Sequence, residues 1–156
     1  MQIAFSQSLS EGAAGSFTMA LGIWNRGARA CKLRGWATIQ FLNADGGLVP
    51  TNWLETTGDF SGSAQPVAVS LLPCAGSGGC TAGATPAAYF SVAGDDVIAP
   101  CVTAARVRVL LPGSSRAVID NLQADGLGAG EVFCSDGKVS VLPIVSTYSP
   151  LGPPYA

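Results

Sequence analysis

Apolar and polar residues alternate with a period of two over much of the chain. In residues 16–24, Phe17, Met19, Leu21 and Ile23 fall on one face of an extended strand, and the residues between them fall on the other. Twenty glycines and ten prolines interrupt the chain at short intervals. No long segment combines an apolar 3.6-residue period with helix caps. We therefore expect short strands and little helix.

Further strands are predicted along the rest of the chain. Residues 105–111 have the clearest pattern, in which Val107 and Val109 alternate with Arg106 and Arg108, so we expect the arginines to face water. About eight strands separated by turn residues predict an all-β sandwich of antiparallel sheets. The domain spans residues 1–148, and residues 149–156 form a proline-rich tail. The predicted strands are residues 3–8, 16–24, 36–42, 66–72, 88–93, 105–111, 116–121 and 138–145.

Asparagine, aspartate and glycine mark one tight turn. The run Asn43-Ala44-Asp45-Gly46-Gly47 follows a predicted strand and favours a hairpin reversal. Asn43 and Asp45, together with Asp95 and Asp96, are also candidate calcium ligands. Their spacing follows no known calcium loop, so the turn interpretation is favoured.

Composition and charge exclude several classes of protein. The 156 residues fit one domain, and 48% hydrophobic against 12% charged residues excludes a disordered chain. A net charge of -2 argues against nucleic acid and anionic lipid as partners. Because the chain has no histidine, histidine-based nucleophile pairs and zinc helices are excluded. Proline and glycine interrupt every apolar run, so no transmembrane segment is expected.

Five cysteines without histidine favour disulfides over a metal site. If residues 105–111 and 116–121 form a hairpin, the chain returns to the end that it left, so Cys101 and Cys134 lie close enough to pair. Cys74 and Cys80 would close a short glycine-rich loop. Cys31 is then left as an unpaired thiol, whose partner lies outside this sequence or which is itself reactive. These disulfides imply an oxidising compartment.

The first third of the chain resembles a known family. Gly-Ala-Ala-Gly-Ser at 12–16 precedes Asn-x-Gly-x-x-x-Cys-x-Leu-x-Gly-Trp at 25–36 and an apolar strand ending in Asn-Ala-Asp-Gly at 43–46. This order is similar to that of the domain of unknown function 4232. The resemblance implies an immunoglobulin-like β-sandwich of exported or lipid-anchored actinobacterial envelope proteins, without an assigned activity. The chain departs from the family in having no cysteine before Gly12 and in its extra loop at 74–80.

The sequence favours a non-catalytic, extracellular or cell-envelope domain with a binding or structural role and no cofactor. A leader or lipid anchor removed from the N-terminus would account for export. The partner is an envelope protein or a glycan, and Trp53 and Phe60, in a predicted surface loop at 51–65, form the candidate binding surface. In the alternative interpretation these aromatic residues cover the end of the sandwich. A self-associating subunit and a hydrolase that uses a pair of carboxylates remain alternatives.

Overall fold

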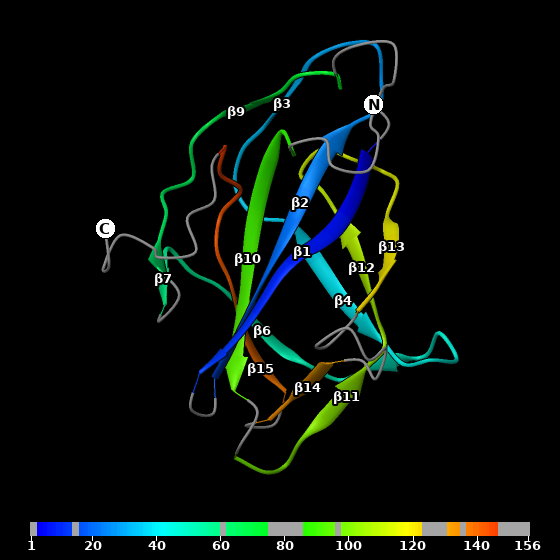
Figure 1. Ribbon diagram of the computed structural model, residues 1–156, viewed down its shortest axis with the longest axis vertical. Helices are drawn as coiled ribbons and strands as arrows, with labels where there is room; N and C mark the ends of the chain where they lie inside the picture. The colour runs from blue at the N-terminus through cyan, green and yellow to red at the C-terminus, as the bar shows by residue number, and fades with distance from the viewer. Residues whose placement is uncertain are drawn as a thin grey trace.

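The computed structural model describes residues 3–13, 16–59, 62–74, 86–95, 98–122, 131–134 and 137–146. All regular secondary structure in these ranges is β, and no helix occurs among them (Figure 1). Consequently, none of the described residues belongs to a helix that could cross a membrane. The prediction of an all-β chain is confirmed.

Fifteen strand segments are described, and five of them have five residues or more. In chain order they are β1 (Ile3–Ala13), β2 (Ser16–Asn25), β3 (Cys31–Leu33), β4 (Thr38–Leu42), β5 (Leu48–Val49), β6 (Asn52–Glu55), β7 (Gly58–Asp59), β8 (Gly62–Ser63), β9 (Val69–Leu71), β10 (Ala88–Asp95), β11 (Val102–Ala104), β12 (Arg106–Leu110), β13 (Val118–Asn121), β14 (Glu131–Phe133) and β15 (Lys138–Val141).

These strands form two main sheets and three small ribbons. The five-stranded sheet has the order β1-β2-β10-β15-β6, and the four-stranded sheet has the order β13-β12-β4-β5. The ribbons pair β3 with β9, β7 with β8, and β11 with β14. All described pairs are antiparallel except β15 with β6, which is parallel. Parallel pairing requires a long crossover, and more than 80 residues separate β6 from β15.

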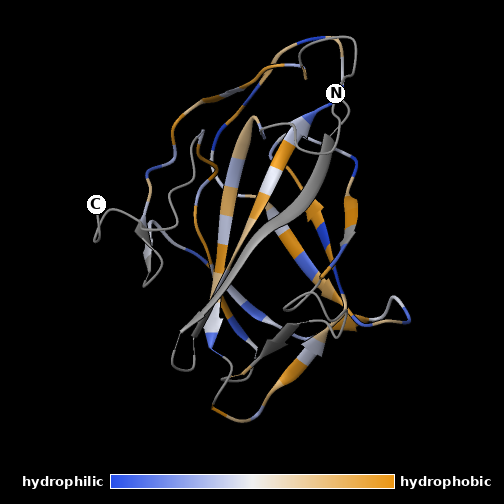
Figure 2. Cartoon of the chain, in the orientation of Figure 1, coloured by the Kyte–Doolittle hydropathy of each residue, from blue (hydrophilic) through white to orange (hydrophobic). Residues whose placement is uncertain are grey.

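One hydrophobic cluster joins the two main sheets. Met19, Leu21 and Phe90 enter it from the five-stranded sheet, whereas Phe41 and Val107 enter from the four-stranded sheet. All five side chains are fully buried. The alternation that buries them is visible as orange bands separated by white or blue along β2, β4 and β12 (Figure 2). The two main sheets therefore pack against each other across a shared core.

All eight predicted segments contain a strand. The prediction of about eight strands is nevertheless too low, because β3, β5, β6, β7, β8, β11 and β14 were not expected. Each of these seven has only two to four residues, too few for a period of two to be recognised. The segment 51–65, predicted to be a surface loop with some order of its own, contains β6, β7 and β8.

The predicted hairpin turn joins β4 to β5. Asn43 N–H donates to Gly47 O at 2.8 Å, and Gly46 N–H donates to Asn43 O at 3.0 Å. The Asn43 side-chain oxygen accepts hydrogen bonds from the backbone N–H groups of Asp45 and Gly47. Gly46 has a φ of +86°, which glycine adopts without steric cost. The Asn43 amide therefore serves the turn, as the sequence predicted.

A disulfide joins Cys101 to Cys134, as predicted. The β12–β13 hairpin returns the chain to its starting end, where β11 pairs with β14 and Val102 lies opposite Phe133. Each cysteine lies next to one of these paired residues, so the ribbon brings the two sulfur atoms together. A structural disulfide is typical of proteins that fold in an oxidising compartment.

Candidate functional site

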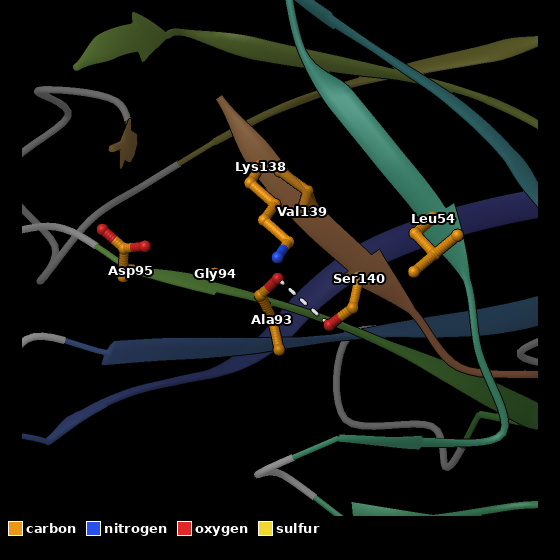
Figure 3. A pocket seen from close by; sticks show the side chains of 7 residues that line it. All are labelled: Leu54, Ala93, Gly94, Asp95, Lys138, Val139 and Ser140. Atoms are coloured by element: carbon orange, nitrogen blue, oxygen red, sulfur yellow. Dashed lines mark hydrogen bonds between the residues drawn. The ribbon is translucent and has the colours of Figure 1, made fainter. Parts of the chain in front are cut away.

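A pocket of about 300 Å³ lies on the five-stranded sheet, near its β6 edge. It is lined by Leu54 of β6, residues 93–95 of β10 and residues 138–140 of β15 (Figure 3). The three strands come from distant parts of the chain. Their pairing therefore decides which side chains meet in the pocket.

The register of pairing between β10 and β15 determines which polar side chains line the pocket. Ala93 lies opposite Ser140, and Gly94 lies opposite Val139. Because successive side chains point to opposite faces of a strand, burial of Val139 in the core directs Lys138 and Ser140 outward. A small residue, Ala93, stands on the outer face between longer neighbours. Its methyl group is among the groups that line the pocket.

The third strand reaches the pocket through its parallel pairing with β15. Asn52 N–H donates to Gly137 O at 2.9 Å at the start of this pairing. Gly137 has a φ of +72°, and a Cβ there would lie 2.8 Å from Pro50 O. Only glycine allows this close approach, which sets Leu54 opposite Ser140. Leu54 is 60% exposed and forms an apolar rim of the pocket.

The polar groups of the pocket are one ammonium, one carboxylate and one hydroxyl. Lys138 is exposed and extends from β15 towards β10, and Asp95 lies farther along β10 (Figure 3). Asp95 is half-buried, and its Oδ1 accepts a hydrogen bond of 3.4 Å from Ile98 N–H. Ser140 Oγ donates to Ala93 O at 3.4 Å. This mixture suits recognition of a ligand that has both apolar and charged groups.

Catalytic chemistry has little support in this pocket. Asp95 is the one carboxylate among its lining residues, whereas carboxylate-dependent glycoside hydrolysis uses two. The Ser140 hydroxyl proton is directed to a backbone carbonyl, and the sequence has no histidine to activate the hydroxyl. The described residues also contain no group of three His, Cys, Asp or Glu side chains that could hold a metal ion.

The predicted aromatic surface is only partly described. Trp53 lies in strand β6 rather than in a loop, is half-buried and packs against the core. The alternative interpretation, in which these aromatic residues cover the end of the sandwich, stays a prediction. Phe60 lies outside the described ranges, so a surface shared by both aromatic residues stays a prediction. Leu54, the residue after Trp53, is the exposed apolar side chain of this strand segment.

Two further cysteines, Cys31 and Cys74, lie at the β3–β9 ribbon. Cys31 pairs with Leu71 in this ribbon, is half-buried, and has its Sγ 3.9 Å from Asn25 Nδ2. Cys74 N–H donates to Asn25 O at 3.0 Å. The structure does not describe Cys80. The Cys74–Cys80 disulfide and the unpaired Cys31 thiol therefore stay predictions.

Sequence reasoning did not find the residues of the pocket. Asp95 is predicted only as a candidate calcium ligand, and Lys138 only as the first residue of a strand. No protein-family model, no curated protein and no solved structure matches the chain. The resemblance to the domain of unknown function 4232 rests on the motif residues alone.

Proposed function

We propose that this chain is an exported, non-catalytic domain that binds another protein through the pocket formed by β6, β10 and β15. One observation carries the proposal. Leu54, Lys138 and Asp95 surround an open pocket beside β6, the edge strand of the five-stranded sheet. An apolar rim with two opposite charges supplies both contact area and orientation for a ligand.

Export and fold belong to the same proposal. The Cys101–Cys134 disulfide supports an oxidising location. The family resemblance adds an envelope location and an immunoglobulin-like β-sandwich. Two sheets that share one core are compatible with that fold.

A protein partner is favoured over a glycan. Glycan sites commonly use an exposed aromatic ring as a stacking platform, whereas Trp53 packs against the core. By contrast, β6 is an edge strand of its sheet, and an edge strand can pair with an extended segment of a partner. An aliphatic side chain of that segment would contact Leu54, and its charged groups would face Lys138 or Asp95.

Site-specific photo-crosslinking in the source cells tests this function. A photoreactive amino acid replaces Leu54 in one variant and Ile119 in a control. Ile119 lies on β13 of the other main sheet and is 54% exposed, close to the 60% of Leu54. We expect a discrete protein adduct from position 54 and none from position 119. The adduct should disappear when Lys138→Glu is added.

Other outcomes would contradict the proposal. Equal labelling from both positions would show that position 54 has no specific partner. An adduct that contains two copies of this chain would instead support the self-associating subunit. Labelling of glycan alone would favour the other ligand class.

A further inference from the structure

Half of the basic side chains of this acidic protein lie in one short segment. Arg26, Arg29, Lys32 and Arg34 are four of the eight Lys and Arg residues, and all four are exposed. Residues 12–44 contain no Asp or Glu. The whole chain has a net charge of -2, but this segment is strongly positive.

The neighbouring strand does not neutralise this region. β3 pairs with β9, and residues 60–94, which include β9, contain no charged residue. Lys32 lies opposite Ser70 in the ribbon. Among the acidic residues whose side chains the structure describes, Asp45, Glu55 and Asp95, none forms an ion pair with the four basic side chains. Because all four basic side chains are exposed, they can reach an external anion.

An exposed leucine directly follows the strand that pairs with β3. Lys32 and Arg34 are exposed on either side of the buried Leu33, so both point outward. On the opposite strand Leu71 is buried, and Leu72, the next residue, is 65% exposed. Figure 1 shows that β3 and β9 lie at one end of the long axis of the molecule. We call Arg26, Arg29, Lys32, Arg34 and Leu72 the basic face.

We propose that the basic face docks on a bilayer that contains anionic phospholipid. Arginine guanidinium groups bind phosphate oxygens in a bidentate manner, and three of the four cations are arginines. An exposed leucine between cations can enter the boundary between headgroups and acyl chains. Single-stranded nucleic acid would instead be expected to use aromatic stacking platforms. Docking at one end of the long axis would hold the molecule upright on the membrane.

Vesicle binding by matched variants tests this proposal. Binding of the folded chain is measured with vesicles of phosphatidylcholine alone and with added phosphatidylglycerol, at low and high salt. We expect binding only to the anionic vesicles, and weaker binding in high salt because the charges are screened. Arg29→Gln/Arg34→Gln should weaken it by about twenty-five-fold, at roughly fivefold for each charge near an anionic surface. The charge-matched control Arg106→Gln/Arg108→Gln, on β12, should weaken it much less.

A second pair of variants tests the leucine. Leu72 and Leu48 are both 65% exposed, but Leu48 lies on β5 of the four-stranded sheet. Leu72→Ser should weaken vesicle binding by about fivefold through lost apolar contact with the bilayer. Leu48→Ser should leave it unchanged. Circular dichroism and thermal melting should show that all four variants remain folded.

Several results would overturn this proposal. One is equal affinity for neutral and anionic vesicles, or no binding to either. Another is equal loss in both arginine variants, which would indicate a nonspecific charge effect. A third is binding to a short DNA duplex that depends on Arg29 and Arg34 while vesicle binding does not.

Discussion

Each end of the molecule has a small two-stranded ribbon. The two ribbons are the same size but differ in the interactions that their residues make. β3–β9 lies at one end of the long axis and β11–β14 at the other, and every strand in them has three residues (Figure 1). The β11–β14 ribbon is crosslinked by Cys101–Cys134. In the β3–β9 ribbon, side chains pack into the core, and the Asn25 side chain donates to Arg29 O and Leu71 O. Ribbons this short need support beyond their own ladder.

Burial explains why the two ends differ. Leu33, Val69 and Leu71 of the β3–β9 ribbon are each at most 3% exposed and belong to the main core. In β11, Ala104 is buried, but its methyl side chain contributes little apolar area, and Val102 is only half-buried. The β3–β9 ribbon therefore contributes larger buried side chains to the core than β11 does.

The largest effect is expected from removal of the disulfide. Cys101→Ala/Cys134→Ala should lower the free energy of unfolding by about 3.7 kcal/mol, because the crosslink joins residues 33 apart in sequence. Chemical denaturation of the variant and of the parent protein, both without reductant, measures the difference. A loss below about 1 kcal/mol would remove the distinction between the two ends.

At the other end, loss of a packed side chain should have a comparable effect. Leu33→Ala should cost about 3 kcal/mol, since it leaves a cavity in the shared core. Val102→Ala in β11 is the control and should cost less than about 1 kcal/mol, because Val102 is half-buried. Equal losses in these two variants, again by chemical denaturation, would contradict the stronger core packing of the β3–β9 end.

A smaller loss should follow removal of the Asn25 side chain. Asn25 is fully buried and donates to Arg29 O at 2.8 Å and to Leu71 O at 3.0 Å, and its Oδ1 accepts from Gly27 N–H at 2.9 Å. Asn25→Ala should cost about 2 kcal/mol, because these buried backbone groups lose their partners.

Asn43→Ala is the matched control for this change. Asn43 also accepts hydrogen bonds from backbone N–H groups, but it is exposed, so water can replace its side chain. Its loss should cost about 0.5 to 1 kcal/mol, and thermal melting can compare the two variants. A larger loss for Asn43→Ala would show that burial does not decide the cost.

The smallest effect is expected at Cys31. Cys31→Ser should change stability by less than about 1 kcal/mol, because the side chain is half-buried and is predicted to have no disulfide partner. Intact mass after alkylation without reductant should show one modified thiol in the parent protein and none in the variant. An unmodified parent protein would show that Cys31 is paired and that both ends of the molecule have covalent links.

Strands in which buried and exposed residues alternate, and features set by local chemistry, were predictable from the sequence. The alternation around Met19 and around Val107 gave strands, and the Asn43 turn and the Cys101–Cys134 pairing followed from local chemistry and hairpin geometry. Most strands of two to four residues were not predictable, because they contain too few positions to show a period. β9, β13 and β15 are equally short but lie within longer segments that were predicted to be strands. The parallel pairing that brings Trp53 next to Val139 has no local signal either.

The candidate site and the basic face were missed for related reasons. Leu54, Asp95 and Lys138 meet only through pairing between strands that are distant in sequence. The prediction against anionic lipid relied on the net charge of the chain, which averages Arg26 and its basic neighbours with distant carboxylates. A count of charges along the chain would have revealed their clustering, but not the exposed Leu72 beside them.

Hydrogen exchange tests the contrast between the two ends most directly. Amide exchange is compared between the parent protein and Cys101→Ala/Cys134→Ala under native conditions. We expect faster exchange at residues 102–104 and 131–133, with little change at residues 31–33 and 69–71. Equal acceleration in both ribbons, or none in β11–β14, would show that the disulfide does not hold its own end of the molecule.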